Sequence, residues 1–239
     1  MTKRVAILQS CYIPWKGYFD LINSVDEFVL YDEVQYTRQD WRNRNRIKTQ
    51  NGTRWLTIPV TVDDLYHQRL DETIVADPRW ATRHWDTLKQ SYRDAPHFRQ
   101  LGPEIEAAYE RCASEPRLSQ VNRALLETVC RLLGIETRLT WSTEYEAHGS
   151  RTERVVSLCE QTGAGLYLSG PSARAYIDES LFERAGIELR YFDYDGYPEY
   201  PQLHPPFEHN VTILDLLFNA GADARALMKS FAGAREDRA

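Results

Sequence analysis

Near the end of the chain, a histidine and an aspartate have the spacing of a general base and its orienting carboxylate. His209 comes just before an expected helix, and Asp215 falls about one turn inside it. A histidine oriented by a carboxylate can accept a proton near neutral pH, which is the minimum that general-base catalysis needs. The structural alternative is that Thr212 caps the helix, Asp215 interacts with the helix dipole and His209 is merely exposed.

A cysteine lies in an aromatic loop near the start of the chain. Residues 9–20 read Gln-Ser-Cys-Tyr-Ile-Pro-Trp-Lys-Gly-Tyr-Phe-Asp, and Cys11 follows an expected strand closely. Cys11 would be a nucleophile if the next helix start and Lys16 lowered the pKa of its thiol. The alternative is a small buried thiol that fills a gap under Trp15. The tyrosine and tryptophan side chains of this loop are expected to stack on an acceptor substrate.

A cationic segment follows. Residues 38–48 contain five cationic side chains and one acid, Asp40. In a strand, Arg42, Arg44 and Arg46 would share one face, where guanidinium groups suit phosphate or carboxylate recognition. The alternative is a solvated edge strand that uses charge to avoid self-association. The patch is too small, in a chain of net charge −6, to predict nucleic-acid binding.

A short turn offers a second anion site. Residues 167–176 run from an expected strand into Ser169-Gly170-Pro171-Ser172. Backbone N–H groups and hydroxyls at such a turn can bind an oxyanion or a phosphate. Turns favour these residue types in any case, so the signal is weak alone.

The elements that must position these groups follow an α/β rhythm. Residues 5–9 predict a buried strand, residues 18–24 a short helix and residues 27–31 a second strand, which is typical of parallel α/β units. Further strands are expected at residues 55–60, 138–141, 166–168 and 187–192. Further helices are expected at residues 152–161, 179–184 and from 212 to 221. We therefore predict a mixed α/β fold with a largely parallel sheet and helices on both faces.

The middle of the chain is helical. Apolar residues recur at three- and four-residue steps between residues 78 and 133, which predicts a central helical segment, an insertion or subdomain at 79–134. A connection rich in proline and aromatic residues follows at 194–210. No low-complexity linker interrupts the sequence, so we expect one domain over residues 1–239.

Composition excludes several classes of protein. The 239 residues are 42% hydrophobic and 27% charged, which is globular rather than disordered. The first apolar run, residues 5–8, is shorter than the roughly 7–15 residues of a secretory signal, and no run approaches a membrane span. With four scattered cysteines expected to be reduced, we predict a cytoplasmic protein without membrane insertion. The histidines and cysteines lack metal-ligand spacing, so no metal site is predicted.

These motifs together resemble the WbqC-like protein family, and the resemblance covers nearly the whole chain. The first half carries Gln9, Tyr12, Pro14-Trp15, Gly17-Tyr18-Phe19, Asp32, Val34-Gln35-Tyr36, Trp41, Asn43-Arg44, Ile47, Trp55-Leu56-Thr57 and Pro59-Val60. The second half carries Tyr167-Leu168-Ser169-Gly170, Tyr200, Gln202, Thr212-Ile213-Leu214-Asp215-Leu216-Leu217-Phe218-Asn219 and Gly221. Members of this family are typically encoded beside genes for the assembly of O-antigen, capsule and other glycoconjugates or small metabolites. The resemblance therefore implies a role in polysaccharide or small-metabolite biosynthesis. The family pattern often has Pro and Asn where this chain has Ser10 and Cys11, which argues against an obligatory Cys11 nucleophile.

We therefore expect a group transferase that forms an amide or ester on a sugar or small amine precursor. The acyl or aminoacyl donor would be a thioester of CoA, or of the phosphopantetheine arm of an acyl or peptidyl carrier protein. No other cofactor is expected. His209, Asp215 and Cys11 are the candidate catalytic residues. The candidate substrate-binding residues are Gln9, Tyr12, Trp15, Tyr18, Gln35, Trp41, Asn43, Arg44, Arg46, Ser169, Gly170 and Gln202. The alternatives are a nucleotidyltransferase-like enzyme and a non-catalytic ligand-binding partner of a glycan assembly pathway.

Overall fold

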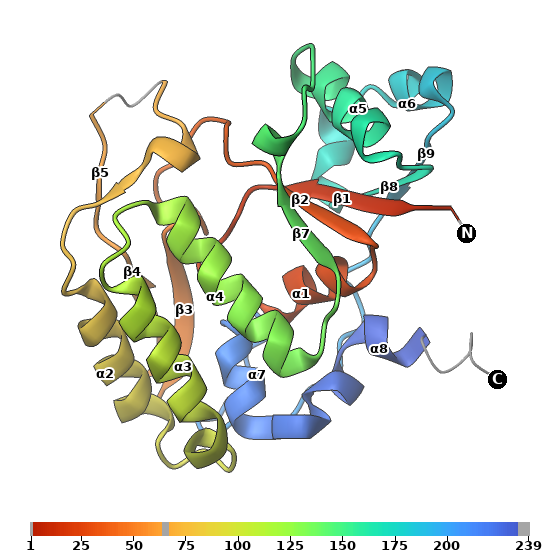
Figure 1. Ribbon diagram of the computed structural model, residues 1–239. Coiled ribbons are helices and arrows are strands. Elements are labelled where there is room, and N and C mark those ends of the chain that lie inside the picture. The colour runs from red at the N-terminus through yellow and green to blue at the C-terminus, as the bar shows by residue number, and fades with distance from the viewer. Residues whose placement is uncertain (1, 64–66, 234–239) are drawn as a thin grey trace.

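A five-stranded parallel sheet forms the centre of the computed structural model, which describes residues 2–63 and 67–233 (Figure 1). Its strand order is β7-β2-β1-β8-β9, and each neighbouring pair is parallel. The strands are β1 (Arg4–Leu8), β2 (Glu27–Leu30), β7 (Arg138–Trp141), β8 (Leu166–Ser169) and β9 (Glu188–Tyr191). The predicted mixed α/β fold is confirmed.

Helices cover both faces of this sheet, as the two-residue period of its strands requires. Val5, Ile7 and Val29 point into a core shared with α5 and α6, whereas Ala6 and Phe28 point into the larger core on the face of α1 and α4. The described helices are α1 (Lys16–Asn23), α2 (Trp80–Tyr92), α3 (Phe98–Cys112), α4 (Leu118–Leu133), α5 (Arg151–Thr162), α6 (Glu179–Ala185), α7 (Ile213–Ala220) and α8 (Lys229–Gly233). Figure 1 shows α5 and α6 on one side of the sheet and α1 and α4 on the other.

An antiparallel hairpin packs on the helical layer of α2 to α4. It pairs β3 (Arg44–Thr49) with β4 (Gly52–Thr57). Asn45 and Ile47 are buried while Arg44 and Arg46 are half-buried on the other face, so these two arginines share a face, whereas Arg42 precedes the strand. The strand expected at residues 55–60 is split between β4 and β5 (Val60–Thr61), which pairs with β6 (Ile74–Val75). Pro59 lies at the break because it has no N–H to donate.

The order of the strands marks one edge of the sheet for binding. The chain moves outward from β1 to β2 and β7, then returns to the other side of β1 for β8 and β9. In open parallel sheets, ligands bind where the direction reverses, at the carboxyl ends of the strands. That edge carries the loops after β1 and β8, which the sequence analysis selected. None of the helices in residues 2–63 and 67–233 is both long and apolar enough to span a bilayer.

Candidate functional site

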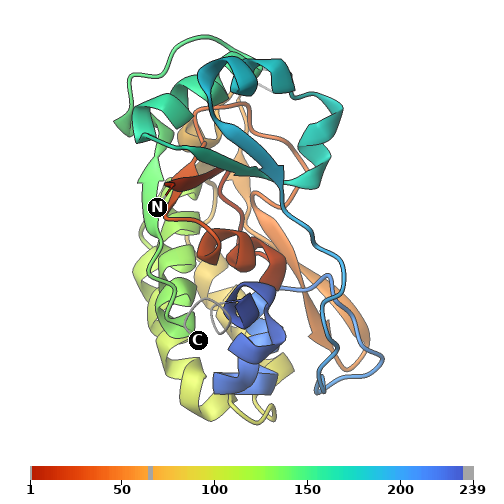
Figure 2. The same cartoon turned by 90° about the vertical axis from the view of Figure 1, so that its right-hand side faces the viewer.

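Three of the four predicted stretches meet beside the hairpin. The Nδ2 of Asn45, on β3, donates to the carbonyl oxygen of Ile13 at 2.7 Å, which ties the β1–α1 loop to the hairpin. The backbone N–H of Thr212 donates to the carbonyl oxygen of Arg46 at 2.9 Å, which ties the start of α7 to the same strand. Figure 2 shows the connection after β9 running past the hairpin before it reaches α7. The arginines of β3 and the His209 segment therefore lie on one side of the molecule.

The arginines form a row beside two exposed indoles. The guanidinium carbon of Arg44 lies 4.3 Å, and that of Arg46 5.7 Å, from the centre of a Trp55 ring. Trp55 and Trp41 are 43% and 41% exposed, and their ring centres are 5.4 Å apart. The Nε atoms of Arg42, Arg44 and Arg46 have no hydrogen-bond partner among the described residues. These Nε atoms are buried, and the terminal nitrogens of Arg42 and Arg44 already donate to Cys11 Sγ and to the carbonyl oxygen of Gln39. Arg46 is therefore the arginine of the row with terminal donors to offer next to the aromatic platform, an arrangement that suits a phosphate attached to a planar ring.

Cys11 lies at one end of this row. A guanidinium nitrogen of Arg42 lies 2.8 Å from its Sγ, and Arg42 also lies 3.8 Å from an Asp40 oxygen. Burial raises the pKa of the Cys11 thiol, and the nearby Arg42 charge lowers it by less. The thiol is therefore neutral near pH 7, which weighs against a resting thiolate nucleophile.

The prediction that Asp215 orients His209 is wrong. The Asp215 carboxylate accepts hydrogen bonds from Tyr92 Oη at 2.9 Å, Tyr200 Oη at 2.8 Å and Gln202 Nε2 at 2.8 Å. His209 lies before the α7 N-cap, and its Nδ1 has no hydrogen-bond partner among the described residues. Asp215 thus stabilises α7 and the connection that leads to it, and it also takes up the side-chain amide of Gln202. The Nδ1 of His209 is also buried.

Lys16, which the sequence analysis considered only for its effect on Cys11, belongs to the site. It begins α1 and is only 3% exposed, and its Nζ donates to the carbonyl oxygen of Pro198 at 3.1 Å. The same Nζ lies 5.0 Å from the ring centre of Tyr197 and 5.1 Å from that of Tyr200. Burial lowers the pKa of Lys16 to about 8, and its charge contributes, after burial, to lowering the pKa of His209. In the sequence, Lys16 stands two residues before the helix expected at residues 18–24, which in fact begins at Lys16.

The turn after β8 does not present its serine hydroxyl to the hairpin. Ser169 is 2% exposed, and its Oγ lies 3.4 Å from Tyr167 Oη. Both residues lie on the same face of β8, and Tyr167 stacks on Phe182 of α6. The hydroxyl therefore points toward the α6 side, which argues against its expected role as an oxyanion donor. A side chain at Gly170 would meet open space, and Pro171 and Ser172 are exposed, so the turn beyond Ser169 faces outward.

Two predicted binding residues belong to the packed interior. Tyr12 is fully buried, and its hydroxyl bonds with His84 Nδ1 at 2.7 Å and Tyr109 Oη at 2.6 Å. Asn43 is 6% exposed and donates to the carbonyl oxygen of Ile58 at 2.8 Å. Their side chains shape the loop and the hairpin from beneath and leave no surface for a substrate.

Other predicted residues form the edge of the β1–α1 loop. Gln9 Nε2 donates to the carbonyl oxygen of Gln35 at 3.2 Å, and Tyr18 Oη donates to the carbonyl oxygen of Gln9 at 2.9 Å. The ring of Trp15 lies 5.4 Å from that of Tyr194, in the connection after β9. Through this contact the loop after β1 is packed against the segment that leads to His209.

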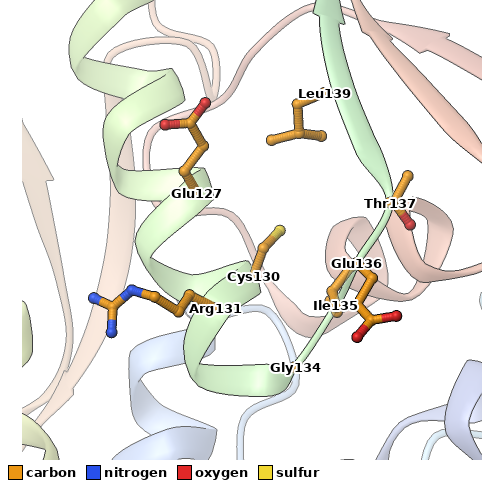
Figure 3. Close-up of a pocket in the computed structure, with 8 residues that line it drawn as sticks. All are labelled: Glu127, Cys130, Arg131, Gly134, Ile135, Glu136, Thr137 and Leu139. Atoms are coloured by element: carbon orange, nitrogen blue, oxygen red, sulfur yellow. The ribbon is translucent and has the colours of Figure 1, made fainter.

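Four hollows are described, and no predicted site residue lines them. One lies where α4 ends, as Figure 3 shows, with a volume of about 430 Å³. Its walls run from Glu127 to Leu139, at the amino end of β7, which is the edge opposite the predicted site. A second, at the carboxyl ends of β2 and β7, includes Asp32 and Ser142. Within the described residues, no group of three or more His, Cys, Asp or Glu side chains has a geometry for a metal ion.

The fold and the site define a doubly wound parallel α/β protein with a cationic, aromatic surface beside its switch point. The chain belongs to the WbqC-like protein family, whose model matches residues 9–227. It is 50% identical over 222 residues to the uncharacterized protein Rv1507c of Mycobacterium tuberculosis, an alignment that covers 93% of this chain and 96% of that protein. No solved structure matches the chain.

Proposed function

We propose that the protein is a group transferase that binds a phosphate-bearing acyl donor along β3. The observation that carries this proposal is the positive charge of Arg42, Arg44 and Arg46 gathered next to the exposed ring of Trp55. The guanidinium of Arg46 makes no hydrogen bond or ion pair with any residue that the structure describes. Free guanidinium donors bind phosphate oxygens strongly, and a flat exposed indole suits a nucleobase.

CoA, or the phosphopantetheine arm of a carrier protein, fits this surface best as donor. CoA joins phosphates to an adenine ring, so the arginines and the indoles each have a part of it to bind. The acceptor is an amine or hydroxyl of a sugar or small precursor in glycoconjugate or specialised-metabolite biosynthesis, as the family resemblance implies.

His209 is the candidate proton acceptor in the transfer. The acceptor nitrogen attacks the thioester carbonyl, a C–N bond forms, the C–S bond breaks and the thiolate leaves with the electron pair. The Nδ1 of His209 is buried, so the proton of the attacking amine passes to the other ring nitrogen, Nε2. Burial and the Lys16 charge lower the pKa of His209, so the ring is neutral at pH 7 and can accept that proton.

Nucleotidyl transfer is the second candidate, and the strand order favours it. The order β7-β2-β1-β8-β9 reverses between β1 and β8, where nucleotide-binding α/β folds hold their ligand. Lys16 at the start of α1 supplies a positive charge that the aromatic residues of the loop lack. Release of pyrophosphate from a nucleoside triphosphate would identify this reaction, whereas acyl transfer from CoA releases a free thiol.

Calorimetric titration with CoA tests the donor surface. We expect Arg46→Ala to raise the Kd for CoA by roughly 10- to 100-fold, because one charge-assisted hydrogen bond is worth about 1.5–3 kcal/mol. Arg54→Ala is the matched control: Arg54 pairs with Ile47, so it lies on the other face of the hairpin. Its Kd should stay within about twofold of the wild-type value.

Equal affinities of wild type and Arg46→Ala for CoA, or no binding of CoA at all, would refute the donor surface.

Thiol release from acetyl-CoA with an amine acceptor then tests the base. His209→Ala should lower that rate by about 10²–10⁴ while the Kd for CoA stays unchanged. CoA binding without any turnover would favour the non-catalytic alternative.

A further inference from the structure

A small polar cavity lies at the carboxyl ends of β2 and β7. Its volume is about 170 Å³, and its walls come from the ends of both strands and from the start of α4. Pockets for drug-sized ligands measure roughly 300–1,000 Å³, so this cavity is too small for a nucleotide or CoA. It suits a single small molecule or one end of a larger one. The edge of the sheet is the one that carries the β1–α1 loop.

Asp32, directly after Tyr31 at the end of β2, is buried in the wall of this cavity. The carboxylate is 1% exposed, and it accepts hydrogen bonds from Ser10 N at 2.7 Å and Ser10 Oγ at 2.6 Å. A carboxylate has about four lone-pair positions, so two remain for another donor. Burial raises the pKa of Asp32 to about 6, more than the hydrogen bonds from Ser10 lower it. An ionised Asp32 therefore gains from a cation brought into the cavity.

The other two carboxylates in the wall are already neutralised. Glu33 accepts from Arg154 at 2.8 Å, and Asp71 is paired with Arg69. Among the described residues, Asp32 has no Lys, Arg or His partner at ion-pair distance, so it is the wall carboxylate left without a cation. The one arginine of the wall, Arg117, lies 3.6 Å from Glu115, so a ligand that carries one positive charge balances Asp32.

A second, independent feature points to a ligand with a hydroxyl or another polar group. Ser142, the first residue after β7, lines the cavity and is 1% exposed. Its Oγ has no hydrogen-bond partner among the described residues. Buried polar groups are almost always hydrogen-bonded, and one that lines a polar cavity without a partner is explained by a bound group.

We propose that this cavity binds a small hydroxylated amine, with its ammonium group on Asp32 and a hydroxyl on Ser142. The cavity wall and the arginine row are physically connected: Asn122 Nδ2 donates to Ser10 Oγ at 3.1 Å and to the carbonyl oxygen of Arg42 at 2.9 Å. In the proposed transfer reaction, this cavity is the subsite that holds the acceptor amine. That role rests on the proposed function, whereas the binding of the amine itself does not depend on it.

Nuclear magnetic resonance of the full chain tests the site. Trp141 lines the cavity and Trp55 lies on the hairpin, so their indole N–H signals, assigned with Trp141→Phe and Trp55→Phe, report the two places separately. We titrate with glucosamine and ethanolamine, and with glucose and ethylene glycol as counterparts without the amine. We expect a saturable shift of the Trp141 signal with an amine, no shift of the Trp55 signal, and at least tenfold weaker binding of the counterparts.

Two variants examine the contacts. Asp32→Asn should raise the Kd of the amine at least tenfold, and Ser142→Ala should raise it about three- to tenfold. Ser172→Ala, at an exposed serine outside the cavity, should leave it unchanged. If neither amine shifts the Trp141 signal saturably, or if the three variants bind the amine with equal Kd, the cavity does not bind amines. This conclusion holds whether or not CoA shifts the Trp55 signal. If the amine binds as expected and CoA fails to bind, the cavity stands and the proposed function falls.

Discussion

At the scale of single residues, the surroundings of Cys11 decide its chemistry more than its type does. A neighbouring guanidinium lowers a thiol pKa, but burial raises that of Cys11 by more. We predict that Cys11→Ala keeps the CoA affinity and any transfer rate within about threefold of wild type. All four cysteines are buried, so the native thiols should react with a disulfide reagent at pH 7 at least about 100-fold more slowly than in the unfolded chain. A variant that folds normally but loses about 100-fold in rate would restore Cys11 as a nucleophile.

Residue types and spacing predicted some partners of the site correctly and others not. The alternation of Arg44 and Arg46 along a strand is local, so a two-residue period was enough to place them on one face. The pairing of His209 with Asp215 depended on the direction of a side chain inside a helix that packs on distant residues. Tyr92, 123 positions away in the sequence, takes the carboxylate instead. Such a partner is invisible without the fold.

At the scale of elements, the start of α1 depends on a close contact between its N-cap, Trp15, and Gly17 in its first turn. A Cβ added at Gly17 would lie 2.4 Å from the Trp15 ring, whereas one added at Gly170 would meet open space. Gly17→Ala must therefore displace Trp15, and we expect it to lower the free energy of unfolding by about 1–3 kcal/mol. Gly170→Ala should change it by less than about 0.5 kcal/mol. Urea denaturation of both variants measures the difference, and equal stabilities would contradict the contact.

The elements themselves were largely predictable because their signals are local. Short runs of a few residues predicted strands at the positions of the five parallel strands. The helices α4, α5 and α6 each end at a glycine in left-handed conformation, a signal that is also local in the sequence. The hairpin was less clear: Pro59 divides what looked like one strand, and the turn between β3 and β4 was not anticipated. The cavity at β2 and β7 was not predictable, because its walls are brought together from four separate segments.

At the scale of the whole molecule, the sheet edge that is proposed to bind ligands also carries an electrostatic cost. Asp32 has a pKa of about 6, above its ordinary 3.8, because burial disfavours the charged form. The folded state thus holds its proton more tightly than the unfolded chain. The stabilising effect of that proton is complete below about pH 4 and is lost as the pH rises through about 6. Arg42 and Asp71 also act on this carboxylate, in opposite directions.

Asp32→Asn removes this titration, so its effect on stability should depend on pH. At pH 4 the wild type and the variant should have similar free energies of unfolding, because both side chains are neutral there. At pH 8 the variant should be more stable by roughly 2–3 kcal/mol, since a shift of one pKa unit corresponds to about 1.4 kcal/mol. Asp26→Asn is the control of opposite sign: slight burial is outweighed at Asp26 by hydrogen bonds from Arg4, which lower its pKa.

Urea denaturation of the three proteins from pH 4 to pH 8 measures both effects. A wild-type curve and an Asp32→Asn curve that run parallel over this range would show that Asp32 ionises freely and that its burial costs nothing. If Asp32→Asn is more stable than the wild type above pH 6 but no longer binds the amine, then the burial of the ionised carboxylate lowers stability and supports binding. The unpaired carboxylate then destabilises the empty protein so that a cation can be held at the sheet edge, a trade between stability and binding that buried functional groups often make.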